Sequence, residues 1–200
     1  MIVLVRHGTT EQNVRGLLLG RADPSLSADG VEQARILAAL LEREGRPMRV
    51  VTSPLRRCRE TAEVIAAPWG MTVDDEPGLI EMDYGEWDER PLADVPRDVW
   101  ESWQRDPDFA PPGGETLRAV QERVSACMAS LLSSVANEGH LIAVSHVSPI
   151  KAAVLWALDL EDRPQLAWRL RLDTGSVCRL ARGPLGPVLT AFNERVATPQ

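Results

Sequence analysis

The first sixteen residues, "MIVLVRHGTTEQNVRG" (1–16), join an apolar run directly to a charged one. Residues 2–5 read Ile-Val-Leu-Val, which is typical of a buried strand, and Arg6, His7 and Gly8 follow at once. In open α/β sheets, ligands bind in the crevice outside the carboxyl ends of the strands. The stretch therefore predicts a strand that delivers Arg6 and His7 to a ligand-binding crevice.

Strand and helix patterns alternate along the rest of the chain. Apolar residues at helical spacing predict helices over 27–45, 56–67, 115–139 and 148–158. Short apolar runs predict strands over 48–54 and 140–146, and two further strands are expected within 169–182 and 187–194. This alternation predicts an α/β fold, a three-layer sandwich in which helices cover both faces of a mostly parallel central sheet.

The middle of the chain, about 79–114, breaks this alternation. A short helix is expected from Val99 to Arg105, with Trp100 and Trp103 at the i,i+3 spacing of one helix face. The remainder is rich in turn residues, so we expect an irregular lid or side wall rather than sheet.

Bulk properties narrow the class of protein. No linker, repeat or low-complexity tract divides the 200 residues, so we expect a single domain over 1–200. The 22 basic and 29 acidic residues disfavour nucleic acid or an anionic membrane surface as partners. No signal-like segment precedes the first strand, and no apolar run approaches the roughly 18 residues of a membrane span, which predicts a cytoplasmic protein.

Positively charged and polar side chains collect at the predicted strand ends. Arg6 and His7 follow the first strand, Arg56 follows the second and His146 follows the third. Cations on neighbouring strand ends repel one another unless an anion neutralises them. Guanidinium groups bind phosphoryl oxygens bidentately, Asn13 can add a neutral donor, and an imidazole can act as a nucleophile without a metal. The pattern therefore predicts a phosphate site.

Four motifs occur in order: "LVRHGTTEQN" (4–13), "SPLRRCRETAEVI" (53–65), "LIEMDYGEW" (79–87) and "AVSHVSPIK" (143–151). Together they resemble the histidine phosphatase superfamily, the fold group of phosphoglycerate mutase, and look most like its branch of α-ribazole phosphatases and bacterial acid phosphatases. The resemblance implies a phosphohistidine mechanism that uses no metal and no other cofactor.

The resemblance also implies a role for individual residues. His7 would be the nucleophile, and Glu81 would be the proton donor. Arg6, Arg56, His146 and Asn13 would hold the phosphoryl group, and Tyr84 would belong to the substrate-binding site. Glu81 has the apolar neighbours Ile80 and Met82, which could raise its pKa if they also surround it in space, whereas composition alone favours an exposed acid.

Three functions fit these motifs: a phosphatase, a phosphoglycerate mutase-type phosphoryl transferase, and a phosphate-binding pseudoenzyme. Mutases of this family place a lysine eight residues after the tyrosine that corresponds to Tyr84, and Leu92 stands there. Arg105 stands alone where paired arginines are expected, and Glu89 replaces a usual glycine. Nucleophile, acid and anion clamp are all present, which disfavours the pseudoenzyme.

We therefore expect a phosphatase that hydrolyses a small phosphomonoester and that has neither nucleic acid nor a membrane as a partner. The sequence leaves open the physiological substrate and whether the chain forms a homodimer.

Overall fold

A six-stranded sheet forms the centre of the protein in a computed structural model that describes residues 1–135 and 139–195. The strand order is β3-β2-β4-β1-β5-β6. The strands are β1 (Ile2–Arg6), β2 (Arg49–Thr52), β3 (Val73–Asp75), β4 (Leu141–Ser145), β5 (Ser176–Gly183) and β6 (Gly186–Arg195). The pairs among β3, β2, β4 and β1 are parallel, and those that join β5 and β6 are antiparallel. The predicted mostly parallel sheet is confirmed.

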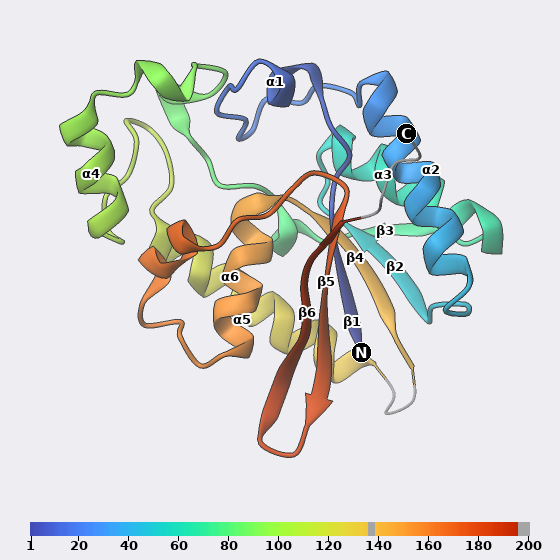
Figure 1. Ribbon diagram of the computed structural model, residues 1–200. Helices are drawn as coiled ribbons and strands as arrows, with labels where there is room; N and C mark the ends of the chain where they lie inside the picture. Colours follow the sequence, from blue (N-terminus) through green and yellow to red (C-terminus); the bar gives the residue numbers. More distant parts are fainter. Residues whose placement is uncertain (136–138, 196–200) are drawn as a thin grey trace.

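Helices cover both faces of the sheet (Figure 1). One face carries α2 (Ala28–Glu42) and α3 (Arg56–Ala66), and the other carries α5 (Leu117–Ser134) and α6 (Val147–Ala157). Successive side chains of a strand point to opposite faces, and so Ile2 and Leu4 pack in the α5–α6 core while Val3 and Val5 pack in the α2–α3 core. The three-layer prediction is confirmed.

The shorter helices connect these layers. They are α1 (Glu11–Val14) and α4 (Arg97–Arg105), with the 3₁₀ turns η1 (Ala67–Trp69), η2 (Pro77–Leu79), η3 (Gly85–Trp87), η4 (Leu92–Asp94) and η5 (Pro164–Arg169). The helix predicted over 115–139 ends at Ser134, and its positions 136–138 lie outside the described residues. No helix in the described ranges is both long and apolar enough to cross a membrane.

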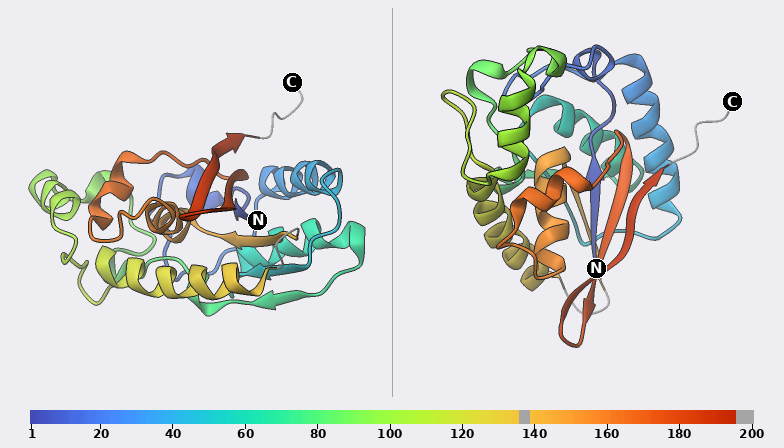
Figure 2. Two further views of the ribbon diagram at one scale, coloured as in Figure 1. Left: turned by 90° about the horizontal axis from the view of Figure 1, so that it is seen from below. Right: turned by 60° about the vertical axis from the view of Figure 1, so that its left-hand side comes forward.

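The strand β5 starts later than the sequence predicts, whereas β6 covers the whole of the predicted 187–194. Residues 164–169 form η5 and residues 170–175 lie outside any strand, so that β5 begins only at Ser176. Extended segments form strands only where a neighbour pairs with them. The pairs with β1 begin at Val177 and those with β6 begin at Ser176. The β5–β6 hairpin then projects beyond the other strands (Figures 1 and 2).

The predicted lid is held together by aromatic rings. Trp103 of α4 is fully buried, and its ring meets Tyr84, Trp87, Trp100 and Trp168 edge to face at centroid distances of 5.2 to 5.8 Å. Trp168 belongs to η5, which packs on α6. The tryptophans therefore fasten the lid to η5, beside the α5–α6 layer, rather than to the sheet itself.

Glu89 lies at a turn of the lid with a φ of 61°. This left-handed backbone region suits glycine and costs other residues roughly 1 kcal/mol. This geometry explains why glycine is usual at this position in the family that the sequence resembles. The turn keeps its shape with Glu89, because the Glu89 N–H donates to the Leu18 carbonyl at 2.8 Å.

The backbone that follows β1 presses against the first turn of α2. The Ser27 hydroxyl caps this helix by accepting a hydrogen bond from the Gly30 N–H. A Cβ on Gly30 would collide with the Thr9 carbonyl, and a Cβ on Gly8 would collide with the Gly30 carbonyl. Two glycines thus allow a backbone contact that fixes the position of His7.

Candidate active site

Two buried histidines lie side by side at the carboxyl edge of the sheet. His7 follows β1 and His146 follows β4, and the register of these parallel strands pairs Arg6 with Ser145. The ring centroids are 5.2 Å apart at an interplanar angle of 64°. Their side chains are 2% and 0% exposed. The structure thus brings together the two strand-end histidines that the sequence singled out.

The hydrogen bonds of these rings set opposite tautomers. His7 Nδ1 lies 2.7 Å from the Gly8 carbonyl oxygen, which can only accept, so Nδ1 carries the proton and neutral His7 keeps a free lone pair on Nε2. The Arg57 guanidinium donates through Nε to His146 Nδ1 at 3.2 Å, so His146 carries its proton on Nε2 and donates it to Ser53 Oγ at 2.7 Å.

Both rings are neutral at physiological pH. Burial lowers the pKa of His7 well below its usual 6.5, and the charges of Arg57 and Arg6 lower it further. Burial likewise lowers the pKa of His146, with Arg57 and His7 adding to the effect. His7 Nε2 is therefore an unprotonated nitrogen, the form that a nucleophile requires.

Arg57, not Arg56, is the arginine beside the histidine pair, which corrects the sequence-based assignment. Arg57 is fully buried and also donates to the carbonyls of Gly20 at 2.8 Å and Ala22 at 2.7 Å. The Arg56 side chain is 60% exposed and pairs with Glu60 at 2.6 Å.

The phase of α3 explains the correction. Consecutive residues of an α-helix point about 100° apart, so the position of the apolar stripe decides which of two neighbouring arginines faces the core. The buried stripe of α3 runs through Arg57, Cys58, Thr61, Ala62 and Ile65, whereas Arg56 shares the outer face with Glu60. That apolar spacing is visible in the sequence and was the signal that could have identified Arg57.

Arg6 supplies a second guanidinium, which is partly buried. Its NH1 group donates to the Leu172 carbonyl at 2.6 Å, while Nε is buried without a hydrogen-bond partner in the described part of the chain. Burial lowers the pKa of Arg6, and the Glu81 carboxylate opposes that change. An unused buried donor is costly unless a ligand accepts from it. Arg6 is thus prepared to bind an anion.

Glu81 belongs to the lid segment, and its buried side chain lies against the first turn of α6. Its Oε1 accepts from the Met82 N–H at 2.7 Å and from the Ser148 N–H, in the first turn of the helix, at 3.3 Å. Tyr84 lies alongside, with its hydroxyl 3.4 Å from Ser148 Oγ. Glu81 also interacts electrostatically with Arg6 and Arg57. The carboxylate is therefore held by a helix N-terminus within the field of both arginines.

Two further residues belong to this cluster and were missed from the sequence. Lys151 lies one helical turn after Ser148 on α6, and burial, with Arg6 adding to it, lowers its pKa to about 8. Asp88 accepts from the N–H groups of Gly20 and Ala22, both at 2.7 Å. Asp88, a lid residue, thereby holds the loop whose carbonyls accept hydrogen bonds from Arg57.

A cavity of about 450 Å³ opens beside this cluster and is lined by Arg6 and Asn13. Asn13 Oδ1 accepts from the N–H and the hydroxyl of Thr10, both at 3.1 Å, which leaves its Nδ2 group free to donate. The cavity lining thus supplies a cationic and a neutral donor, and the buried His7 and Glu81 belong to the cluster of side chains around Arg6. Such a set can bind a dianionic phosphoryl group and exchange it with a nitrogen.

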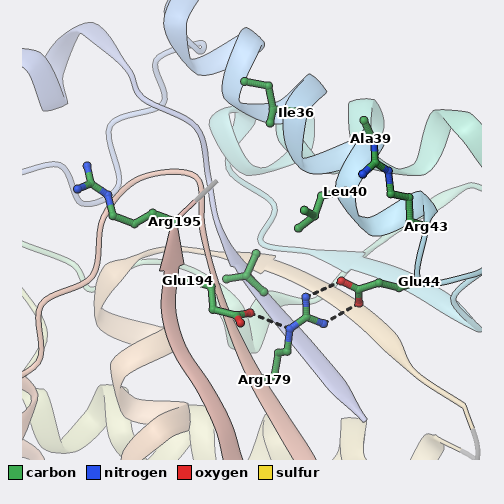
Figure 3. Close-up of a pocket in the computed structure, with 9 residues that line it drawn as sticks. Ile36, Ala39, Leu40, Arg43, Glu44, Arg179, Glu194 and Arg195 are labelled. Atoms are coloured by element: carbon green, nitrogen blue, oxygen red, sulfur yellow. Dashed lines mark hydrogen bonds and ion pairs between the residues drawn. The ribbon is translucent and has the colours of Figure 1, made fainter. Parts of the chain in front are cut away.

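Another cavity, of about 600 Å³, lies between α2 and the β5–β6 hairpin and contains none of the predicted site residues (Figure 3). Arg179 spans it, bonded to both carboxylate oxygens of Glu44 at 2.6 Å and to Glu194 at 2.8 Å. Its buried charge is already neutralised, so the geometry assigns it a structural role. In residues 1–135 and 139–195 no group of three His, Cys, Asp or Glu side chains is arranged to hold a metal ion.

The sequence profile of the "Histidine phosphatase superfamily (branch 1)" matches residues 2–195. The chain belongs to the histidine phosphatase superfamily. The resemblance drawn from the four motifs is confirmed.

Curated relatives of this chain include a mutase. The "Bifunctional protein Rv2228c" of Mycobacterium tuberculosis is 33% identical over 180 residues, which cover 88% of this chain and 48% of the relative, so the chain spans about half the length of that relative. A 2,3-bisphosphoglycerate-dependent phosphoglycerate mutase of Azorhizobium caulinodans is 34% identical over 165 residues, which cover 78% of this chain and 80% of the mutase.

Solved structures similar to this chain include phosphatases. The mycobacterial glucosyl-3-phosphoglycerate phosphatase Rv2419c, in complex with VO3, superposes with a TM-score of 0.87 at 27% identity, covering 97% of this chain and 98% of that one. The α-ribazole phosphatase of Shigella flexneri has a TM-score of 0.84 at 27% identity, covering 100% and 98% of the two chains. The family thus places this chain among phosphatases and mutases.

The opposite tautomers give a direct spectroscopic prediction. In the unliganded protein at neutral pH, ring nitrogen shifts should show a proton on Nδ1 of His7 and on Nε2 of His146, with neither ring titrating near 6.5. Long-range proton–nitrogen correlation spectra measure this, and His7→Gln assigns the signals. Unfolding exposes two histidines that take up protons, so the free energy of unfolding should fall as the pH drops below about 6.5. A proton on His7 Nε2 would contradict the assignment.

The neighbouring arginines form a matched pair for mutation. Arg57→Lys keeps the charge but cannot bond His146, Gly20 and Ala22 together, so it should lose about 1–3 kcal/mol of stability and bind phosphate about tenfold more weakly. Arg56→Lys should change neither. Urea unfolding and calorimetric phosphate binding measure the two quantities. A larger loss of phosphate affinity in Arg56→Lys would restore the assignment made from the sequence.

Proposed function

We propose that this protein is a metal-independent phosphomonoester phosphatase that acts on a small phosphorylated metabolite through a phosphohistidine. The observation that carries the proposal is the state of His7, whose Nδ1–H is fixed on the Gly8 carbonyl while Nε2 stays unprotonated in the field of Arg6 and Arg57. A neutral, oriented imidazole beside two arginines combines a nucleophile with an anion-binding site.

In the first step, His7 Nε2 attacks phosphorus and the ester P–O bond breaks. Glu81, which carries a proton in the substrate complex, gives it to the leaving alcohol. Arg6, Arg57 and Asn13 hold the phosphoryl oxygens. In the second step, water attacks the phosphohistidine, Glu81 takes a proton from that water, and the P–N bond breaks to release inorganic phosphate and restore neutral His7. The guanidinium groups stabilise the charge on phosphorus that a metal would otherwise neutralise.

His146 contributes in a different way. Both of its ring nitrogens are engaged, one with Arg57 and the other with Ser53. It therefore orients the Arg57 guanidinium, and it contacts the phosphoryl group when its Nε2–H exchanges the Ser53 hydroxyl for a phosphoryl oxygen. Lys151, beside Arg6 and Glu81, adds positive charge to the site below its pKa of about 8.

Mutase activity is the alternative, and the mutase relatives favour it. Against it stands Leu92, which lines the same cavity as Arg6 and Asn13 and is 40% exposed. An alkyl side chain cannot bind the carboxylate of a phosphoglycerate. A mutase must keep the phosphoglycerate bound through two phosphoryl transfers. The position of Leu92 thus supports hydrolysis over transfer.

The central test is the covalent intermediate. A brief reaction with a radiolabelled phosphomonoester should leave an acid-labile, alkali-stable label on His7, and chelators should not affect turnover. His7→Ala should lose both label and turnover while it keeps phosphate binding, because the arginines remain. His140→Ala, at the partly exposed third histidine, is the control and should keep both. Near-normal turnover by His7→Ala would exclude the proposed nucleophile.

The role of Glu81 as the proton donor is tested by varying the leaving group of the substrate. An alkoxide needs a proton as it departs, whereas nitrophenolate is stable without one, and such proton donation is worth about 10²- to 10⁴-fold in rate. Glu81→Gln, which keeps the acceptor for Met82 and Ser148, should slow phosphoenzyme formation by about that factor with an alkyl phosphate and much less with p-nitrophenyl phosphate. Rapid-quench kinetics measure both. Glu86→Gln, at an exposed acid of the same segment, should match wild type; equal slowing of both substrates in Glu81→Gln would remove Glu81 as the acid.

A further inference from the structure

The cavity that contains Arg6 and Asn13 extends beyond the phosphate site. It reaches from the segment after β1 to Leu92 of the lid and to the turn at Asp173 and Thr174. Its volume of about 450 Å³ is in the range of cavities that bind small organic ligands. A bound phosphomonoester with its phosphoryl group on Arg6 and Asn13 would place its organic part here.

One wall of this cavity is apolar. It is formed by Val14, Leu17, Leu18 and Leu92. Val14 is 67% exposed and Leu92 is 40% exposed, so apolar surface faces solvent inside the cavity. The two segments that carry this wall are joined by backbone hydrogen bonds, from the Leu18 N–H to the Arg90 carbonyl at 2.9 Å and from the Leu92 N–H to the Gly16 carbonyl at 3.3 Å. The wall is thus built before any ligand binds.

The opposite wall is polar, and its hydrogen-bond directions can be assigned. Gln33 Oε1 accepts from the Thr9 N–H at 2.9 Å and from the Thr9 hydroxyl at 3.1 Å. Because the Thr9 proton is used there, Thr174 must donate in its 2.7 Å bond to Thr9. This leaves lone pairs on Thr174 and the Nε2 donors of Gln33 for a ligand. A donor beside an acceptor matches a hydroxyl group, which is both.

The charges of the cavity disfavour a second anion on the ligand. The polar wall contains the Asp173 carboxylate. Thr174 offers a ligand only lone pairs, because its hydroxyl proton is donated to Thr9. Arg195 is the cation at this end, but it is 72% exposed and already paired with Asp173 at 3.3 Å. Arg171 is likewise paired with Asp173, at 3.2 Å. A carboxylate placed here would find the neutral Gln33 amide as a donor beside the Asp173 carboxylate and two arginines that are already paired, whereas a hydroxyl would find partners for both of its functions.

We propose that this cavity binds the organic part of the substrate and selects phosphorylated sugars and sugar–heterocycle compounds over phosphomonoesters that carry a second anionic group. Such molecules have a ring with an apolar face for the leucine wall and a hydroxyl-bearing edge for Gln33 and Thr174. The proposal rests on the phosphatase function proposed above and names the substrate class of that site.

The test compares ribose 5-phosphate with 3-phosphoglycerate, in wild type and in two variants that each place a new lysine on an exposed leucine. Wild type should favour ribose 5-phosphate in kcat/KM by about tenfold or more. Leu92→Lys adds a cation to the apolar wall and should move that ratio about tenfold towards 3-phosphoglycerate. Leu185→Lys, at the fully exposed tip of the β5–β6 hairpin, adds the same charge elsewhere and should leave the ratio unchanged.

A third variant tests the polar wall, and inhibition by vanadate monitors the phosphate site. Thr174→Val removes the hydroxyl acceptor and should lower kcat/KM for ribose 5-phosphate about two- to tenfold without a matching loss for 3-phosphoglycerate. Inhibition by vanadate should stay the same in all variants, because the phosphoryl ligands are intact.

The outcomes separate this inference from the function on which it rests. If no phosphomonoester reacts through His7, the phosphatase proposal fails and the substrate class fails with it. If His7 forms a phosphoenzyme but wild type prefers 3-phosphoglycerate, or Leu92→Lys and Leu185→Lys shift the ratio equally, only the substrate class is overturned.

Discussion

The buried guanidinium of Arg57 joins three parts of the chain that lie far apart in sequence. It bonds His146 at the end of β4 and the carbonyls of Gly20 and Ala22, and that loop is held in turn by Asp88 of the lid. A buried charge is costly unless it is hydrogen-bonded and balanced, and removing one partner of such a network destabilises strongly. The carboxylate of Glu81 balances part of the charge of Arg57 and Arg6. Asp23 and Asp88 also act on Arg57, and Asp173 acts on Arg6. A bound anion adds to this balance, which makes the fold and the phosphate site interdependent.

The position of His7 depends on backbone contacts rather than on side chains. The parallel register of β1 and β4 brings both histidines to one edge, the Gly8 carbonyl holds the His7 ring, and α2 presses on the same peptide through Gly30. These groups have little freedom to move, because glycine is the only residue that fits at either contact. A nucleophile that is oriented before the substrate arrives loses little entropy in the reaction.

Much of this arrangement could be predicted from the sequence, because it follows from local patterns. Apolar runs that end in Arg6-His7 and in His146 indicate both the strands and the edge at which they meet. The choice between Arg56 and Arg57 needed the helical phase of α3, which the apolar spacing contains. Other features depend on contacts between distant segments. Asp88 acts through backbone N–H groups, which leave no residue pattern, and the start of β5 is set by where its pairing with β1 and β6 begins. The lid turn at Glu89 contradicts the residue preference and is stabilised by Leu18.

The aromatic cluster of the lid makes this segment optically visible. Of the six tryptophans in the chain, Trp87, Trp100, Trp103 and Trp168 form one group in which rings meet at 4.9 to 5.5 Å. Near-ultraviolet circular dichroism arises from aromatic rings in fixed packing, whereas the far-ultraviolet signal follows the backbone. The near-ultraviolet spectrum of this protein is therefore dominated by the lid and by η5 beneath it, and any repacking of that segment around a ligand changes the spectrum while the helices and the sheet leave the far-ultraviolet signal unaltered.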